Sequence, residues 1–413
     1  MEELKREHIQ VSKIKTKILE VATRGDSFEC NKTSSKITAV RIAKNSWGIA
    51  SSNLDNESEL IKKAMSFASK GSKKIELAEA KLAHGSYSIG KGFFDEEECI
   101  TFLSDLVKQI KEELGRCFVE GIVTYEESIR NIKTSDGADA SEEKRLIDLN
   151  ISVALKGVSS LHIGKIGGLN AIESDFEIIT NEIKRKAIGL LTAKYLNPLM
   201  RGFKMDVILS KEASCAFFHE LAHKLEADVV SKIEIREGNK EITLHDDPLN
   251  GFGGYFFDDE GVLAEKKVLI ERGKVKNLLH TRETARKFNT KPKGNGRGLY
   301  TIPKAFQSNL VVEAGDWSFE EMVEEMREGF ILEGLVKAEL QDDVILIYPE
   351  LGWYVKSREI VCPAIVNCVK IPVPDSLNLV RCVGNKTFER ISYEKGFPIS
   401  EKCPPVLLKA KLG

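Results

Sequence analysis

Residues 118–134 read FVEGIVTYEESIRNIKT, and apolar and polar side chains alternate along this stretch. Alternation with a period of two predicts a β-strand with one buried face. The turn-forming segment SDGADAS follows at 135–141, and a second strand-like stretch, LIDLNISVALKG, occupies 146–157. Because Gly, Asp and Ser favour tight turns, we expect two antiparallel strands joined by a loop.

Helical patterns lie on both sides of this strand pair. Asp95 is a favourable N-cap for a helix, and Gly115 is a favourable stop. The apolar side chains between them recur at helical spacing and are Ile100, Leu103, Leu106 and Ile110. A shorter helix is expected across 60–70 and a long one across 175–195. The first seventy residues otherwise combine a helical start with a short sheet, so we expect an α+β first half.

The second half of the chain carries a different pattern. A strand at 203–210 and a helix at 211–228 open it, and turn signals with short alternating runs follow. The Asn-Pro pair at 197–198 disfavours continuation of the preceding helix. Because 413 residues exceed a typical single domain, we expect an N-terminal α+β domain at 1–200 and a C-terminal β-rich domain at 201–413.

The composition argues against several classes of protein. The chain has 61 Lys and Arg against 63 Asp and Glu, a formal net charge of -2, which disfavours a dedicated nucleic-acid binder. No stretch approaches the roughly 20 apolar residues of a membrane helix, and the start is charged. The eight cysteines form no CxxC pair, which is typical of neither a disulfide scaffold nor a zinc ribbon. We therefore expect a soluble, cytoplasmic protein.

The segment HELAH at 219–223 is the most informative motif in the chain. Its apolar neighbours recur at helical spacing, so we expect the motif to lie on a helix. Residues four apart share one helix face, which lets His219 and His223 converge on one divalent ion. Zinc is the usual occupant of such a site.

Glu220 supplies the base that peptide hydrolysis requires. Zinc lowers the pKa of a bound water to about 7, and a nearby carboxylate can accept the water's proton and deliver it to the leaving amine. Two histidines are one ligand fewer than a catalytic zinc usually has. Glu226 lies too far along the helix to share the ion, and we expect Glu226 and Asp228 to orient a histidine or cap a turn.

The surroundings of this motif resemble the TldD/PmbA family, once called modulators of DNA gyrase and better regarded as metallopeptidases. The resemblance is carried by FFHELAHKLEAD at 217–228, DDP at 246–248, the stretch 256–285, KGNGRG at 293–298 and VGN at 383–385. It extends to the first half, where VRIAKNSWGIASSNLD at 40–55 and TSDG at 134–137 are similar to the family's first domain.

The resemblance implies a peptidase that acts on unfolded or extended polypeptides. It also implies a dimer that encloses the active sites, either a homodimer or a heterodimer with a family member that lacks the metal motif. Because this chain keeps His219, Glu220 and His223, it is similar to the catalytic TldD type.

Two features of this chain differ from the family pattern. The family spacing is HExxxH, one residue longer than here. The family's third metal ligand is a cysteine near the C-terminus, but the matching segment, 388–396, contains none. Cys382 and Cys403 lie on either side of that segment, and they or another residue are left as candidates for the third ligand.

Weaker patterns leave other interpretations open. The GNGRG loop at 294–298 follows two lysines and suggests phosphate binding, but it lacks the GK[ST] of a P-loop, so we expect a solvated or substrate-gating loop. The acidic run at 258–260 is expected to form a turn rather than a calcium or magnesium site. The leading hypothesis is cleavage of short or unfolded peptides held at a sheet edge. The alternative is a non-catalytic subunit or peptide-binding module, and a gyrase-directed role rests on the family's older name alone.

Overall fold

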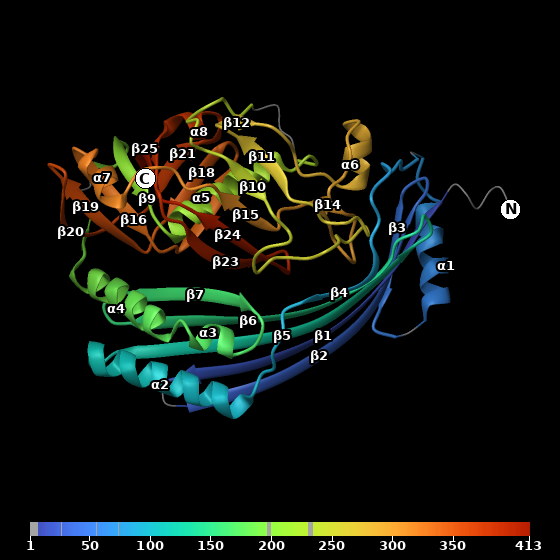
Figure 1. Ribbon diagram of the computed structural model, residues 1–413, viewed down its shortest axis with the longest axis horizontal. Coiled ribbons are helices and arrows are strands. Elements are labelled where there is room, and N and C mark those ends of the chain that lie inside the picture. Colours follow the sequence, from blue (N-terminus) through green and yellow to red (C-terminus); the bar gives the residue numbers. More distant parts are fainter. Residues whose placement is uncertain (1–6, 26, 55, 73, 196–199, 230–233) are drawn as a thin grey trace.

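The computed structural model describes residues 7–25, 27–54, 56–72, 74–195, 200–229 and 234–413. One long, curved sheet is built from the first half of the chain, and three further sheets are built from the second half (Figure 1). The predicted α+β class is confirmed, with strands predominating in the second half. The Asn-Pro pair at 197–198 lies outside the described residues. None of the described helices is long and apolar enough to cross a membrane.

The first sheet has seven strands in the order β3-β2-β1-β5-β6-β4, with β7 also paired to β6. Its members are β1 (His8–Arg24), β2 (Ser27–Ala43), β3 (Trp47–Ser52), β4 (His84–Ile89), β5 (Phe118–Thr134), β6 (Asp139–Ala154) and β7 (Val158–Ile166). All neighbours are antiparallel except β4 and β6. The two strands expected from alternation are β5 and β6, which pair along their length.

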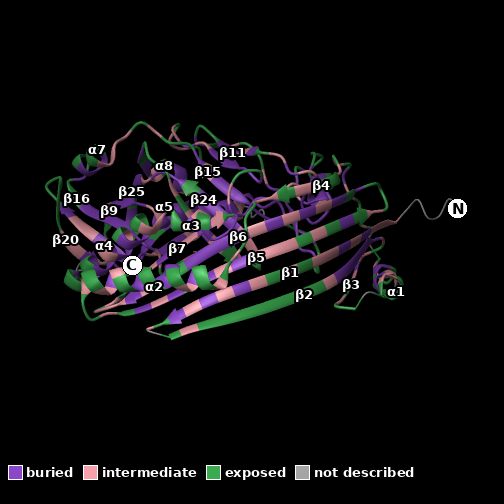
Figure 2. Cartoon of the chain, turned by 60° about the horizontal axis from the view of Figure 1, so that its bottom comes forward, coloured by how far each residue is buried: buried purple, intermediate pink, exposed green. Residues whose placement is uncertain are grey.

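The predicted helical start is wrong over the described residues, because β1 is a strand of 17 residues. It pairs with β2 along its whole length and with β5 from Gln10 to Arg24. Hydrogen bonding to a neighbour on both sides outweighs the local preference of this charged stretch. The first half of β2 is exposed, and Figure 2 shows it as the long green part of this strand.

Four helices pack at the two ends of this sheet (Figure 1). They are α1 (Glu57–Ala68), α2 (Glu96–Leu114), α3 (Asn170–Glu173) and α4 (Phe176–Thr192). The side chain of Asp95 accepts a hydrogen bond from the backbone of Glu98, and Gly115 ends α2, as predicted. A core cluster joins Leu103 and Leu106 of α2 to Val123 in β5. The predicted long helix ends at Thr192 because the chain turns into a short strand there.

Two larger sheets and a short ribbon form the second half. The ten-stranded sheet contains β8 (Lys194–Tyr195), β9 (Lys204–Leu209), β16 (Glu328–Glu333), β17 (Lys337–Gln341), β18 (Val344–Tyr348), β19 (Leu351–Lys356), β20 (Glu359–Ile365), β21 (Val369–Pro372), β22 (Val380–Val383) and β25 (Val406–Leu412). The six-stranded sheet contains β10 (Leu244–Asp246), β11 (Lys267–Glu271), β12 (Lys274–Val275), β15 (Asn309–Val312), β23 (Phe388–Glu394) and β24 (Phe397–Cys403). The ribbon pairs β13 (Gly296–Arg297) with β14 (Lys304–Ala305).

The remaining helices are short and are α5 (Glu212–Ala222), η3 (His223–Leu225), α6 (Arg282–Lys287), α7 (Phe319–Glu324), η4 (Val373–Asp375) and α8 (Ser376–Leu379). All 11 residues of α5 are buried. Phe217 and Leu221 of this helix share one core cluster with Leu209 of the ten-stranded sheet and Leu310 of the six-stranded sheet. Apolar packing on both sides therefore fixes the helix that carries the HExxH motif.

The glycine-rich segment 294–298 is buried, so the prediction of a solvated loop is wrong. The carboxylate of Asp258 accepts a hydrogen bond of 2.8 Å from the backbone N–H of Gly296. A Cβ atom at residue 296 would collide with the carboxylate of Glu260, which explains the need for glycine there. The acidic run at 258–260 forms a turn, as predicted, and this turn holds the glycine-rich segment.

Candidate metal centre

Helix α5 presents two histidines at its C-terminal end. His219 lies in its last turn, and His223 is its C-cap residue, with helical backbone angles (φ -59°, ψ -28°). The centroids of the two imidazole rings are 5.0 Å apart. The four-residue spacing of the motif therefore brings both rings to one end of a buried helix.

Glu394, the last residue of β23, is the third member of this cluster. Its Oε2 atom lies 2.9 Å from Nε2 of His219 and 3.3 Å from Nε2 of His223. One ligand atom from each residue lies within 4.8 Å of the other two. No local sequence pattern indicates Glu394 as a ligand, although it falls inside the segment 388–396, where the family's cysteine was expected. That segment brings a carboxylate to the histidines instead of a thiol.

A tight turn fixes the position of Glu394. Residues 395 and 396 connect β23 to β24, and Glu394 pairs with Phe397 across the turn. The φ angles of Lys395 and Gly396 are 54° and 80°. Two positive φ angles are typical of a two-residue turn whose twist matches that of the flanking strands. The Nζ atom of Lys395 also lies 3.2 Å from Oε1 of Glu394, the carboxylate oxygen that faces away from the histidines.

Each histidine is also bonded to a second carboxylate through its other ring nitrogen. The Nδ1 atom of His219 lies 2.6 Å from Oε1 of Glu401, and Nδ1 of His223 lies 2.8 Å from Oε1 of Glu226. Both of these carboxylates are buried. When Nδ1–H donates to a carboxylate, Nε2 keeps its lone pair free for a metal ion, an arrangement typical of metal-ligating histidines. Here both Nε2 atoms face Glu394.

The electrostatics of the cluster favour a cation at its centre. Burial raises the pKa of Glu401, but the Arg390 guanidinium, whose Nε lies 2.9 Å away, and His219 lower that pKa to about 2. Burial lowers the pKa of His223, but hydrogen bonds to Glu226 and Glu394 outweigh it and raise the pKa to about 10. The surrounding carboxylates therefore stabilise positive charge, carried by protons on the imidazoles or by a metal ion.

Gln307 is a further polar contact of the cluster that our sequence analysis did not identify. Its Nε2 atom lies 2.9 Å from Nδ1 of His219, and its side chain is buried. Within the described part of the chain, Oε1 of Gln307 has no hydrogen-bond partner. Asp246 fixes the segment that carries Gln307, because its Oδ1 accepts hydrogen bonds of 2.7 Å from both the backbone N–H and the hydroxyl group of Ser308, the next residue. No local pattern indicates Gln307, because its role depends on contacts between distant segments.

The other residues singled out on the motif helix have distinct places. Glu220 is buried in α5 and makes no hydrogen bond or ion pair with another described residue. Glu226 orients His223, as described above. Asp228 accepts a hydrogen bond from the backbone N–H of Ala305 in β14, so its carboxylate fastens the chain after η3 to that strand.

Neither candidate cysteine belongs to the cluster. Cys403 is buried in the core beside Cys215, and burial together with that neighbouring thiol raises the pKa of Cys403 well above its usual value. A thiol held in its protonated form is a poor zinc ligand, because zinc binds the thiolate. Cys382 packs in a separate cluster with Met322.

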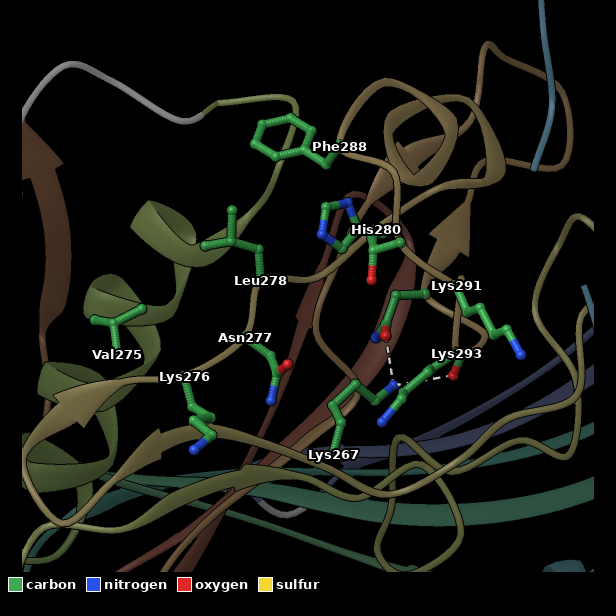
Figure 3. Close-up of a pocket in the computed structure, with 11 residues that line it drawn as sticks. Lys267, Val275, Lys276, Asn277, Leu278, His280, Phe288, Lys291 and Lys293 are labelled. Atoms are coloured by element: carbon green, nitrogen blue, oxygen red, sulfur yellow. Dashed lines mark hydrogen bonds between the residues drawn. The ribbon is translucent and has the colours of Figure 1, made fainter. Parts of the chain in front are cut away.

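Lys291 and Lys293, which suggested phosphate binding, border a different cavity of about 260 Å³ (Figure 3). Lys267 also lines it, and its Nζ lies 3.0 Å from Oδ2 of Asp246 and 3.2 Å from the carbonyl oxygen of Lys293. This buried ammonium group is already paired. The cavity contains none of the three clustered ligand residues.

Comparison with known proteins identifies relatives of this chain. The sequence model of the PmbA/TldA metallopeptidase C-terminal domain matches residues 202–409. A metalloprotease of Methanocaldococcus jannaschii is 34% identical over 72% of this chain and 71% of its own length. A metalloprotease of Archaeoglobus fulgidus is 28% identical over 93% of each chain. The sequence of this chain is therefore similar to those of both relatives well beyond the HExxH motif.

The fold is shared with a solved structure. The crystal structure of TldE from Thermococcus kodakarensis superposes with a TM-score of 0.76 at 16% identity, covering 98% of this chain and 96% of that one. At such low identity the superposition establishes the fold alone, whereas the sequence matches establish the relationship. The chain therefore belongs to the PmbA/TldD family of metallopeptidases.

Proposed function

We propose that this chain is a zinc-dependent peptidase whose ion is held by His219, His223 and Glu394. The observation that carries the proposal is the donor set: two imidazole nitrogens and one carboxylate oxygen within 4.8 Å of one another. Two histidines and a glutamate are a common protein ligand set for a catalytic zinc, which keeps a further position open for water or substrate. Glu394 is the most exposed of the three side chains, at 28%, which is compatible with access from its side.

The chain's own residues prepare the site for such an ion. Glu401 and Glu226 hold the two rings in one orientation and favour the tautomer whose Nε2 is free. When bound, zinc would supply Lewis acidity, which acidifies water and polarises a carbonyl group. The buried carboxylates would also offset the charge of a divalent ion in a site of low dielectric constant.

Glu220 is proposed as the general base. It follows His219 directly in α5, and its carboxylate forms no hydrogen bond or ion pair with another described residue. In hydrolysis its carboxylate would accept one proton from the attacking water, and the hydroxyl group would add to the scissile carbonyl carbon. Glu220 would then deliver the proton to the leaving amine as the C–N bond breaks. The products are one new carboxyl terminus and one new amino terminus.

The proposed substrates are short or unfolded polypeptides in extended form. β23, which carries Glu394, is an edge strand of the six-stranded sheet. An extended peptide can add to a sheet edge through backbone hydrogen bonds, which select an unfolded conformation rather than a particular sequence. A peptide aligned with β23 would pass beside the metal ligands.

We further propose a cytoplasmic location and a dimeric assembly. All eight cysteines are free, which is usual in a reducing compartment. The family resemblance suggests either a homodimer or a heterodimer with a motif-free relative. Light scattering of the purified chain, alone and with such a relative, distinguishes these two assemblies.

A non-catalytic subunit is the competing function. It was favoured by the absence of the family's cysteine from 388–396, and the carboxylate of Glu394 in that same segment removes much of its support. The HExxH motif of this chain is one residue shorter than the family's motif, so an experiment has to decide between a catalytic peptidase and a non-catalytic subunit.

The deciding test is elemental analysis of protein purified without chelator or an affinity metal, followed by cleavage assays on unfolded peptides. We expect close to one zinc per chain, its loss in His219→Ala, and zinc-dependent cleavage. Efficient cutting of folded proteins, with unfolded chains ignored, would contradict the substrate proposal. Absence of zinc, even after its addition, would favour the non-catalytic subunit.

A further inference from the structure

A second cavity, of about 290 Å³, lies between the two halves of the chain. Residues of β1, β5 and β6 line one side of it. Tyr255, Arg297 and residues 396–398 line the other side. Because residue 396 belongs to the turn that follows Glu394, the cavity begins beside the proposed metal centre.

Arg297 has hydrogen-bonding capacity that the described protein does not use. Its side chain is 7% exposed, and its guanidinium carbon lies 4.4 Å from the ring centroid of Tyr255 and 4.1 Å from that of Phe397. Its Nε lies 3.6 Å from Oδ2 of Asp259, which is close enough for an ion pair but too far for a hydrogen bond. Nε and Nη1 have no hydrogen-bond partner among the described residues. Buried donors without acceptors are rare and costly, so such a group in a cavity wall indicates a missing partner.

The nearby carboxylates are committed to other groups. Arg130 forms ion pairs with both Glu142 and Asp259. Glu142 also accepts a 2.6 Å hydrogen bond from the backbone N–H of Phe256. Asp259 accepts one of 2.8 Å from the backbone N–H of Gly298. These groups hold the cavity wall together and leave the free N–H groups of Arg297 unsatisfied.

Lys144 and Glu126 also line the cavity. Lys144 donates a 2.7 Å hydrogen bond to the carbonyl oxygen of Gly254. Burial raises the pKa of Glu126, which reduces the negative charge that this residue presents at neutral pH. The lining therefore carries three cationic groups, on Arg130, Lys144 and Arg297, and three carboxyl groups. Glu142 and Asp259 are paired with Arg130, and the third, Glu126, has its negative charge reduced, so the N–H groups of Arg297 remain available.

A chain of aromatic contacts connects Arg297 to the metal centre. Phe397 stacks on Arg297 and pairs with Glu394 across the turn. Phe306 lies between Phe397, at 6.0 Å, and His223, at 6.1 Å, measured between ring centroids. A polypeptide with one group at Arg297 would thus reach the proposed cleavage centre along these rings.

We propose that Arg297 binds a carboxylate group of the substrate polypeptide in this cavity, next to the centre where the peptide bond is cleaved. This inference rests on the peptidase function proposed above. A volume of about 290 Å³ lies just below the range of about 300–1,000 Å³ that is typical of ligand pockets, so it suits one or two residues. A carboxylate is favoured over a carbonyl because hydrogen bonds between charged groups are about twice as strong as neutral ones.

The carboxylate could come from the C-terminus of the substrate or from an Asp or Glu side chain. The test uses zinc-loaded, full-length protein and four versions of one fluorescent peptide. They carry a free or an amidated C-terminus, combined with Asp or Asn at one internal position. We expect kcat/KM to be about 10- to 100-fold higher for peptides that present the recognised carboxylate. A difference between the free and amidated peptides identifies the C-terminus as the source of the carboxylate. A difference between the Asp and Asn peptides identifies the side chain.

Variants assign the preference to Arg297. In Arg297→Gln we expect the preference to disappear, so that kcat/KM becomes similar for all four peptides, and Arg297→Lys should keep part of the preference. Arg286→Gln, at an exposed arginine, is the matched control. If Arg297→Gln does not fold, the wild-type comparison of the four peptides still decides the question. Equal kcat/KM for all four would overturn the carboxylate site while leaving the peptidase function intact.

Binding measurements separate failure of this inference from failure of the proposed function. Fluorescence anisotropy of the same peptides with Glu220→Gln requires no turnover. Tighter binding of the carboxylate peptides, lost in the Glu220→Gln/Arg297→Gln double variant, would support the site even if no peptide were cleaved. Equal affinities for all four peptides would overturn it.

Discussion

The carboxylate of Glu401 lies 2.6 Å from Nδ1 of His219, although the two residues are 182 positions apart in the chain. Arg390, directly opposite Glu401 on the neighbouring strand, holds the same carboxylate through its second oxygen. The orientation of a proposed metal ligand on a helix is therefore set by a strand pair from the end of the chain.

The first prediction concerns this contact. We expect Glu401→Gln to weaken zinc binding by about 10- to 100-fold, because the ring loses its charged hydrogen-bond partner. The buried Arg390 also loses its counter-charge, so stability should fall by about 3–5 kcal/mol. Chelator competition gives the first value and urea unfolding the second. Glu389→Gln, at an exposed glutamate of β23, is the control, and equal zinc affinity in both variants would exclude an orienting role for Glu401.

The second prediction tests Glu394 as the third ligand. Glu394→Ala should lower zinc affinity by more than about 100-fold. Loss of a residue that only hydrogen-bonds to a metal ligand typically costs about 10- to 100-fold in affinity, and loss of a direct ligand should cost more. Glu394→Cys restores the family's ligand type in the same segment, and we expect it to recover zinc binding in part. Zinc stoichiometry after dialysis measures both. Unchanged stoichiometry in Glu394→Ala would mean that another residue completes the site.

The third prediction separates chemistry from metal binding. Glu220→Gln should lower kcat by about 10²- to 10⁴-fold, because the amide cannot accept the proton of the attacking water. Zinc content and KM should stay close to the wild-type values, since Glu220 is not among the proposed ligands. Steady-state cleavage of an unfolded peptide and metal analysis of the same sample provide the check. A variant with full activity would rule out Glu220 as the base.

The fourth prediction is a pH dependence of stability. The pKa of His223 is raised from 6.5 to about 10, so below pH 6.5 the imidazole is protonated in both the folded and unfolded states and its full stabilisation is present. As pH rises towards 10, the unfolded chain releases the proton while the folded chain keeps it, and the stabilisation is lost. Chelator-treated wild type should therefore lose Tm over this window more steeply than His223→Ala.

Zinc should abolish that difference. Coordination requires a neutral imidazole nitrogen, so the zinc-loaded protein carries no such proton to lose. Thermal unfolding from pH 6.5 to 10, with and without zinc, measures the effect. Identical slopes for chelator-treated wild type and His223→Ala would contradict the assigned protonation.

The fifth prediction concerns the contact between the two halves of the chain. Arg130 of β5 forms buried ion pairs with Glu142 in the same sheet and Asp259 in the second half. Arg130→Met should cost about 3–5 kcal/mol, because it removes the counter-charge of buried Glu142 and one of the ion pairs of buried Asp259. The control is Lys133→Met on the same strand, where an exposed ion pair with Asp139 should contribute less than about 1 kcal/mol. Urea unfolding of the two variants gives both values.

Part of this protein was predictable because local sequence carries the signal. The cap at Asp95 and the stop at Gly115 mark α2, since a helix end is satisfied by residues within one turn of it. The alternation in 118–134 marks β5, because successive strand side chains face opposite sides. The HExxH motif likewise predicts a helix with two neighbouring imidazoles, because residues four apart share a helix face.

The tertiary structure alone decided the rest. β1 is a strand because it pairs with a neighbour on each side, and no residue next to it in sequence encodes those partners. Glu394 and Glu401 reach the histidines only because β23 and β24 form a hairpin beside α5, after more than 170 intervening residues. The sequence by itself determined the metal-binding helix, because helix geometry is local. Strand pairing across the chain determined which carboxylates surround it, because hydrogen bonds between distant strands leave no fixed spacing in the sequence.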